Sequence, residues 1–410
     1  MEYKKLRILS YNREIDIEEE FKKRVSSYTT IRTGLEIIPF LNEQKVTDKK
    51  FELFYLPLQR MSNKAERIKY NSDDLRTLSN RLPGVAETKI FLSTMINEIQ
   101  STNETEGIES TKREIGKAII NRNDKINNKE KRRFEGIVNM YLNLNEKNFE
   151  FIKEPKDFRN IYNALFEDES DIGDWPDGKL FRHDQVELKD NEKIIHRGLT
   201  TEEEIYSACD RLIAFMNNKD IPYLEKCFIS HYYFEYVHPF YDGNGRMGRF
   251  LISSYLARKL DPYTGLSVSN AVNNNKPKYY KAFEEVSHPR NMGEMTHFID
   301  DMMDLIISGQ EKSLVDLKEA DIKMKFVSQY LKELSDVDED QKKILFVLIQ
   351  DYLFSMFGSM DDEEVSVAVE LSRYKLKTKL EQLVKLGLVE KIKYSPSKHK
   401  ISAKVIEDIS

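Results

Sequence analysis

One short segment, His238–Arg249, holds the residues of this chain that are best suited to chemistry. The imidazole of His238 has an ordinary pKa of about 6.5, so it can accept a proton near neutral pH and act as a general base. Gly243 and Gly245 let the backbone curl, so that successive N–H groups converge. The apolar run Phe250–Leu260 predicts a helix whose N-terminus carries these N–H groups. The segment therefore predicts an anion site with a base beside it.

Two arginines and a carboxylate extend this site. Arg246 and Arg249 are three residues apart at the start of the predicted helix, so they share a face and can each bind a phosphate group. Asp242 precedes the glycine turn, where phosphate would repel its carboxylate unless a divalent cation stood between them. Mg²⁺ is usually held by one or two carboxylates together with phosphate oxygens. These residues predict phosphoryl or nucleotidyl transfer, with Mg²⁺ on Asp242.

The segment resembles the signature of the Fic family, H-x-F-x-(D/E)-G-N-G-R-x-x-R. It meets the fixed positions at His238, Phe240, Asp242, Gly243, Asn244, Gly245, Arg246 and Arg249. The resemblance implies transfer of AMP from ATP to a hydroxyl of a target protein, with His238 as base, Asp242 on Mg²⁺ and the Gly243–Arg246 turn on the phosphates. The Doc-like branch, which phosphorylates its target, departs at the second glycine, so Gly245 favours AMP transfer. Each part alone also has a structural reading, because glycine turns and helical arginines are common.

A second informative segment lies far upstream, at 101–110. It resembles the inhibitory motif (S/T)-x-x-x-E-(G/N) of self-restrained Fic proteins, which Thr102, Glu106 and Gly107 match. The resemblance implies that Glu106 pairs with Arg249 and occupies the guanidinium fork meant for the γ-phosphate, so that basal activity is low. The alternative is an ordinary surface loop or helix cap.

Composition is that of a globular protein. The chain has 410 residues, 40% hydrophobic and 33% charged, which is enough for two or three domains with their own cores. A net charge of -6 argues against nucleic-acid binding by the whole surface. Cys209 and Cys227 form no C-x-x-C pair, which favours reduced buried thiols over a disulfide. No signal peptide is evident, and no apolar run approaches the roughly twenty residues that span a bilayer. We expect a cytoplasmic protein without a membrane segment.

The expected fold is mainly α, with a Fic-type helical core, a β-hairpin flap, an α-rich N-terminal extension and a C-terminal winged helix-turn-helix. Residues 1–100 are expected to form the extension, which mixes short apolar runs with helix-like segments and ends at the inhibitory segment. The core is expected over residues 101–320, with the inhibitory motif at 102–107, the flap at 181–198 and the signature at 238–249.

The flap prediction rests on alternating residues from Phe181 to Leu188, a polar turn at 189–192 and a second strand from Lys193 to Arg197. In the family such a hairpin lies beside the site, where its edge can add a strand from the target. The alternative is a hairpin that only covers the core.

Tyrosines and histidines outside the signature bear on the site as well. In Fic proteins a segment similar to Tyr279-Tyr280 lines the nucleoside end of the pocket, although a tyrosine pair at a helix start is also common in cores. The remaining histidines lack metal-ligand spacing, so no transition metal is expected.

The last segment, residues 335–410, reads as three helices between Gln341 and Leu386, the third capped by Ser372, followed by strands at 388–394 and 400–405. This order is typical of a winged helix-turn-helix. Residues 371–400 hold nine Lys or Arg against two acids, a basic stripe that could contact DNA. Winged helices also serve as dimerisation or docking modules.

Two function classes follow. The first is an autoinhibited AMP transferase that modifies a target protein and itself, with the winged helix positioning a partner or a second subunit in a homodimer. The second is a DNA-binding regulator whose core senses nucleotide. Removal of AMP from a modified target is a further activity that some autoinhibited relatives have.

Overall fold

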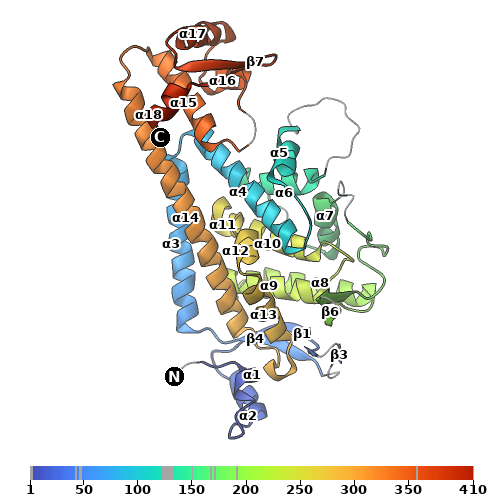
Figure 1. Ribbon diagram of the computed structural model, residues 1–410. Coiled ribbons are helices and arrows are strands. Elements are labelled where there is room, and N and C mark those ends of the chain that lie inside the picture. Colours follow the sequence, from blue (N-terminus) through green and yellow to red (C-terminus); the bar gives the residue numbers. More distant parts are fainter. Residues whose placement is uncertain are drawn as a thin grey trace. The chain divides into compact units, whose positions relative to one another are not determined.

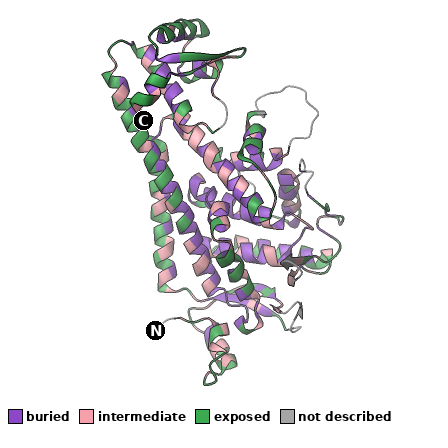
Figure 2. Cartoon of the chain, viewed as in Figure 1, coloured by how far each residue is buried: buried purple, intermediate pink, exposed green. Residues whose placement is uncertain are grey.

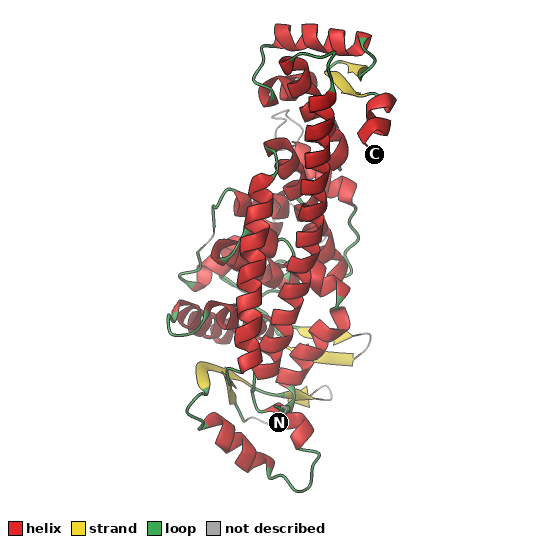
Figure 3. Ribbon diagram, turned by 90° about the vertical axis from the view of Figure 1, so that its left-hand side faces the viewer, coloured by secondary structure: helices red, strands yellow, loops and turns green. Residues whose placement is uncertain are grey.

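The computed structural model describes residues 3–41, 44–45, 49–121, 133–149, 151–166, 169, 172–190, 193–356 and 359–409. This part of the chain is mostly helical, and its strands are short (Figure 1, Figure 3). The mainly α fold class is thereby confirmed. The chain divides into two compact units, one of residues 1–72 and 98–311 and the other of residues 73–97 and 312–410. Within the described ranges, no helix is long and apolar enough to cross a membrane.

The first unit begins with two short helices and four strands. These are α1 (Leu6–Leu9), α2 (Ile17–Val25), β1 (Ile31–Ile37), β2 (Phe40–Leu41), β3 (Gln44–Lys45) and β4 (Phe51–Tyr55). β1 pairs antiparallel with β4, and β2 with β3. The apolar runs of the extension, which the sequence pattern assigned to an α-rich region, therefore contribute strands. Their side chains join a small core made of Leu6, Phe51, Phe54 and Met292.

Two helices at the centre of the first unit, α9 (Tyr223–Val237) and α10 (Asn244–Lys259), carry the signature. α9 buries 10 residues and α10 buries 11, so both helices are packed on nearly every side (Figure 2). The other helices of this unit are the start of α3 (Gln59–Arg81), the end of α4 (Gly84–Thr105), α5 (Lys112–Asn121), α6 (Glu135–Asn145), α7 (Pro155–Phe166), α8 (Glu202–Asn217), α11 (Pro262–Gly265), α12 (Val268–Asn274), α13 (Lys276–Ser287), the 3-10 helix η1 (Pro289–Asn291) and the first part of α14 (Thr296–Glu333).

The predicted flap is present as a shorter hairpin. β5 (Glu187–Asp190) pairs antiparallel with β6 (Lys193–Arg197), and the turn residues 191–192 lie outside the described residues. The predicted first strand was too long, because residues 181–186 are not a strand. The N–H of Phe181 instead donates to the carboxylate of Glu202 at 3.0 Å, and that of Arg182 donates to the carbonyl of Pro239 at 3.1 Å.

The second unit combines the remaining parts of α3, α4 and α14 with the C-terminal elements. These are α15 (Glu339–Phe354), α16 (Asp362–Ala368), α17 (Arg373–Lys385), β7 (Val389–Tyr394), β8 (Ser397–Ile401) and α18 (Ala403–Ile409). Ser372 caps α17 as predicted, since its hydroxyl accepts the N–H of Lys375 at 3.3 Å. The predicted strand over 400–405 is wrong after Ile401. Ser402 starts a helix there, because its carbonyl accepts the N–H of Ile406 at 3.1 Å.

Candidate functional site

The signature segment forms the tight connection between α9 and α10. After Val237 the backbone of His238 is left-handed, with φ 52°, and its N–H donates to the carbonyl of Phe234 at 2.9 Å. Asn244 closes the loop, because its side chain accepts the N–H of Phe240 at 3.0 Å and donates to the carbonyl of Phe240 at 2.8 Å. These local bonds fix His238 at the end of one helix, directly before the start of the next.

The imidazole of His238 is held neutral. Burial lowers the pKa of this imidazole to about 3, and the nearby His196 and Arg182 act in the same direction. Only a neutral imidazole can accept a proton, so this ring has the protonation state that a base needs at pH 7. The negative charge of a bound polyphosphate would raise this pKa toward the range in which a general base works best.

A buried arginine fixes the backbone around His238. The guanidinium of Arg182 is fully buried and donates to the carbonyls of His238 at 2.8 Å and Leu199 at 2.7 Å. Burial lowers the pKa of Arg182 to about 10, so the group stays charged at neutral pH. Because Leu199 follows the β5–β6 hairpin, Arg182 ties the end of that hairpin to the His238 loop. No sequence pattern had marked Arg182 for this role.

The N-terminus of α10 lacks a side-chain cap. Gly243 is the N-cap residue with φ 79°, and a Cβ there would come within 2.9 Å of the ring of Phe166, so both the backbone and the packing require glycine. The first N–H groups of a helix have no partner within the helix, and they carry the positive end of its dipole. An anion is therefore favoured at this point.

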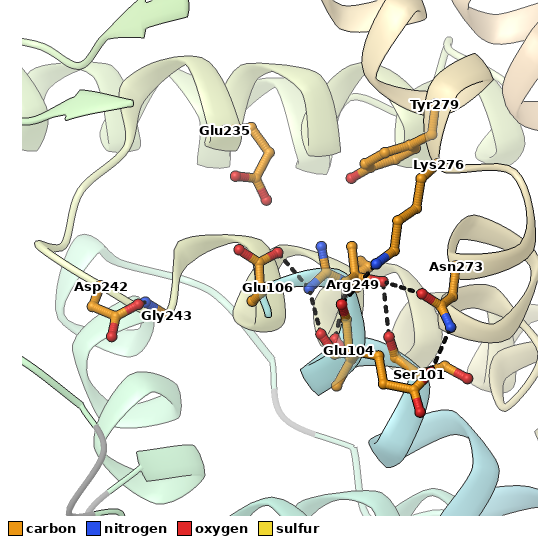
Figure 4. A network of polar contacts seen from close by, with 12 residues as sticks. Ser101, Glu104, Glu106, Glu235, Asp242, Gly243, Arg249, Asn273, Lys276 and Tyr279 are labelled. Atoms are coloured by element: carbon orange, nitrogen blue, oxygen red, sulfur yellow. Dashed lines mark hydrogen bonds and ion pairs between the residues drawn. The ribbon is translucent and has the colours of Figure 1, made fainter. Parts of the chain in front are cut away.

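Glu106, just after α4, supplies such an anion. A Cβ on Gly245 would lie 2.9 Å from Cδ of Glu106, so the carboxyl group rests directly on the first turn of α10. Oε1 of Glu106 accepts a hydrogen bond from Nη2 of Arg249 at 2.7 Å (Figure 4). Burial lowers the pKa of Arg249, but the Glu106 carboxylate raises it further, so the net shift is upward and the guanidinium stays charged.

Thr102 completes the coordination of this arginine. Nε of Arg249 donates to Oγ1 of Thr102 at 2.9 Å, and Nη2 donates to the Thr102 carbonyl at 3.1 Å. Gly107 follows with φ 74°, a left-handed conformation that favours glycine and lets the chain leave the helix. The structure thus brings the predicted Thr102 and Glu106 into contact with Arg249, which is buried at 1% exposure, and places Gly107 at the turn that follows Glu106.

Hydrogen bonds hold the end of α4 against α12 and α13. The buried carboxylate of Glu98 accepts the N–H groups of Ser269 and Asn270 at the start of α12, at 2.7 and 3.1 Å. The side chain of Glu104 accepts from Asn273 at 2.7 Å, and its carbonyl accepts from Nζ of Lys276 at 2.7 Å (Figure 4). The segment that carries Glu106 is therefore docked in place.

Thr102→Val is expected to lower the free energy of unfolding by about 1–2 kcal/mol, because the buried Nε of Arg249 loses its acceptor while the side-chain volume is kept. Urea denaturation of the variant measures this loss. The control is Thr77→Val, whose hydroxyl bonds only its own helix at 2.8 Å on an exposed surface and should change stability by no more than about 0.5 kcal/mol. Equal stabilities of the two variants would contradict the role given to Thr102.

Arg246 is directed to a different carboxylate. One nitrogen of its buried guanidinium bonds Glu169, and the group lies 4.6 Å from the centre of the ring of Phe166. Within the described residues, Nε and Nη2 of Arg246 are buried without hydrogen-bond partners. A buried charged donor without an acceptor is costly, and a bound phosphate oxygen would satisfy it. Glu169 was not among the predicted site residues.

Asp242 precedes the α10 N-terminus as a half-buried carboxylate. Its Oδ1 accepts the N–H of Gly243 at 2.5 Å. Across the described part of the chain, no group of three or more His, Cys, Asp or Glu side chains is placed to hold a metal ion. A single carboxylate fits Mg²⁺, which commonly takes its remaining ligands from phosphate oxygens and water.

The two tyrosines considered for the nucleoside differ in exposure. The hydroxyl of Tyr279 lies 2.7 Å from Nε2 of His231, and its ring is buried against Phe283 at 5.0 Å. The side chain of Tyr280 is 45% exposed, and its hydroxyl donates to the carbonyl of Thr105 at 3.4 Å. Tyr280 thus contacts the end of α4 and is the more exposed of the pair.

Glu235 is a site residue that sequence reasoning missed. It lies one turn before His238 on α9, and Figure 4 shows its carboxyl group directed toward Glu106 and Arg249. Burial raises the pKa of this carboxyl to about 8, and Glu106 raises it while Arg249 lowers it. A single acid within the otherwise apolar and aromatic run at 232–237 was the available signal.

Comparison with known proteins shows which family the region around the signature is similar to. Residues 152–256 match the model of the Fic/DOC family, a range that includes the hairpin and the signature. A curated relative from Aquifex aeolicus, named a probable protein adenylyltransferase, is 38% identical over 69 residues, which is 17% of this chain and 19% of the relative. The match thus spans about a fifth of that relative's length.

Solved structures resemble the chain over a longer range. A Fic family protein from Desulfovibrio desulfuricans G20 is 16% identical with a TM-score of 0.51, covering 85% of this chain and 98% of that one. The match to Fic-1 from C. elegans covers 63% of this chain and 74% of the solved chain, at 15% identity. Its TM-score is 0.43, which is too low to support a common fold. Residues 152–256 are thus similar to the Fic/DOC family, and the chain shares its fold with a solved Fic family protein.

Proposed function

We propose that this chain is an autoinhibited protein adenylyltransferase, which transfers AMP from ATP to a hydroxyl side chain of a target protein and of itself. The observation that carries the proposal is the carboxylate of Glu106 at the N-terminus of α10, bonded to Arg249. A phosphate is the other anion that a guanidinium fork and a helix N-terminus bind well. The name of the curated relative supports the same chemistry.

His238 has the position and protonation state of the base in this reaction. The acceptor hydroxyl oxygen attacks the α-phosphorus of ATP, the bond from that phosphorus to the bridging oxygen of the β-phosphate breaks, and pyrophosphate leaves. The hydroxyl proton passes to the neutral imidazole of His238. The N–H groups at the start of α10 with Asn244, Gly245 and Arg246 bind the phosphates, and the exposed ring of Tyr280 is the surface for the adenine.

Asp242 would hold Mg²⁺ together with phosphate oxygens. The ion would supply neutralisation of charge on the phosphates during transfer. The carboxylate lies next to Gly243 at the phosphate end of the site, as this role requires.

Inhibition follows from competition for Arg249. Glu106 and a terminal phosphate of the nucleotide cannot both bond the same guanidinium edge, and a Cβ on Gly245 would collide with the Glu106 carboxylate, which therefore fills the space on the first turn. A nucleotide that binds with Glu106 in place is displaced from the geometry for in-line attack.

The position of the label on ATP tests the reaction type. ATP radiolabelled at the α-phosphate should label the Glu106→Gly variant, whereas ATP labelled at the γ-phosphate should not. Label from the γ-phosphate alone would show phosphorylation instead of AMP transfer and would overturn the proposed reaction.

Removal of AMP is a second activity of the same site, in which Glu106 assists a water molecule. The wild-type chain with Mg²⁺ should release AMP from protein that has been modified by the Glu106→Gly variant, and Glu106→Gly should not. Modified protein that keeps its AMP with the wild-type chain would exclude this activity.

The second unit favours a further candidate function, DNA binding by a winged helix-turn-helix made of α15–α17 and the β7–β8 hairpin. Its basic stripe at 371–400 is partly neutralised, because Arg373, Lys375, Lys379 and Lys400 pair with acids. Among the described residues, no acid partner is found for four exposed lysines: Lys377, Lys385, Lys391 and Lys393. Because about half of the basic stripe is paired with acids, we rank the DNA-binding regulator below the transferase. A second copy of the chain is the other partner considered for this unit.

DNA binding is tested by the salt dependence of duplex affinity. Exchange of these four lysines for glutamine should reduce the slope of log affinity against log salt by about 3–4, as expected for lost phosphate contacts. An unchanged slope would contradict DNA binding through these four lysines.

A further inference from the structure

Two carboxyl groups rest on one face of α10, and only one of them belongs to the inhibitory motif. A Cβ on Gly245 would lie 2.9 Å from Cδ of Glu106, and a Cβ on Gly248 would lie 3.2 Å from Cδ of Glu235. Because these glycines are three residues apart, the two carboxyl groups lie about one helical turn, ~5 Å, from one another. Arg249 is the cation beside both groups, and Figure 4 shows all three side chains converging.

Among the residues that the structure describes, Arg249 is the one cation that acts on Glu235. From its own helix α9, Nδ1 of His231 lies 4.0 Å from Oε1 of Glu235, too far for a hydrogen bond. Burial lowers the pKa of His231 to about 3, so this ring is neutral. From the other elements, the groups that interact with Glu235 are Arg249 on α10, Glu106 after α4, and Tyr279 and Tyr280 on α13.

Arg249 is already occupied by Glu106 and Thr102. Oε1 of Glu235 is buried, and no hydrogen-bond partner for it is found among the described residues. An ionised carboxylate in that position would be both desolvated and repelled by a second anion one turn away. A neutral carboxylic acid avoids both costs, and burial does raise the pKa of Glu235 to about 8.

We propose that Glu235 is a positioning residue of the anion site, which admits an anion onto Arg249 in its neutral form and repels that anion once ionised. The anion is Glu106 in the inhibited chain and a phosphate of ATP in the active one, so this inference rests on the proposed function. Glu235 acts through Arg249 and is not itself a catalytic residue. Because Glu235 can be neutral beside the anion, the same pocket can accept either the Glu106 carboxylate or a phosphate.

The consequence is a nucleotide affinity that falls above neutral pH. If only the neutral form admits the phosphate, the apparent dissociation constant rises in inverse proportion to the neutral fraction. With a pKa of about 8 this fraction falls about tenfold between pH 7 and pH 9.

Equilibrium binding of ATP with Mg²⁺ tests this, in a chain that carries Glu106→Gly and His238→Ala so that neither inhibition nor turnover intervenes. Loss of Glu106 removes one of the causes that raise the pKa of Glu235, so the dissociation constant should rise at least about tenfold between pH 7 and pH 9 in this background. It should rise less than about twofold when Glu235→Gln is added. Glutamine keeps the shape and cannot ionise. A matched control is Glu225→Gln on the same helix, where burial also raises the pKa but the site is distant, and it should leave the tenfold rise intact.

The outcomes separate the inference from the function on which it rests. Identical pH profiles with and without Glu235→Gln, or a profile that Glu225→Gln also flattens, would overturn the role of Glu235 while ATP binding stands. Absence of ATP binding at every pH would instead contradict the proposed function.

Discussion

Replacement of Glu106 by glycine is expected to raise the initial rate of AMP incorporation by about 10- to 100-fold. The substitution removes the acceptor 2.7 Å from Nη2 of Arg249, and a charge-assisted hydrogen bond of this kind contributes about 1.5–3 kcal/mol to holding Glu106 at this position. It leaves Thr102 in place to orient the guanidinium. Glu106 is partly exposed, at 34%, so the lower part of this range is the more realistic expectation. The rate is measured with ATP labelled at the α-phosphate.

The matched control is Glu109→Gly, three residues further along in an exposed segment. It makes the same chemical change without touching Arg249, and it should leave the rate unchanged. A Glu106→Gly rate equal to wild type, with both proteins folded, would show that the carboxylate on α10 does not restrain the site.

His238→Ala, introduced together with Glu106→Gly, is expected to lower the rate of AMP transfer by about 10²- to 10⁴-fold, the usual contribution of a general base. ATP affinity should change little, because the proposed function assigns phosphate binding to the α10 N-terminus and its arginines and not to the imidazole. Single-turnover transfer and equilibrium ATP binding measure the two effects separately.

His183→Ala serves as the control for this second variant. His183 lies before the hairpin with its side chain 75% exposed, so its loss should affect neither transfer nor binding. Transfer that survives His238→Ala at the rate of the His183→Ala protein would require another base.

The order of the signature residues along the chain was predictable, because they all lie in one contiguous segment. Spacing alone places His238 before a glycine turn and Arg249 on the following helix, and the structure keeps this order in α9, the loop and α10. The contact between Glu106 and Arg249 joins residues 143 apart in sequence. Only the resemblance to an inhibitory motif connected them, since no periodicity carries information over that distance.

The residues that sequence reasoning missed act through tertiary contacts. Arg182 bonds backbone carbonyls of the His238 loop, and Glu169 bonds Arg246 across 77 residues. Neither residue has a pattern around it that predicts burial. Local rules failed in two other places. The carboxylate of Glu202 accepts the N–H of Phe181, the first residue of an expected strand, and Ser402 begins an unexpected helix.

Intact mass of the Glu106→Gly chain after incubation with ATP and Mg²⁺ tests the central claim most directly, beside wild type and the His238→Ala, Glu106→Gly double variant. We expect a gain of one or more AMP units in the single variant only, which would establish the transfer, its base and its inhibition together. A gain of equal size in wild type, or in the chain that lacks His238, would contradict this account of the site.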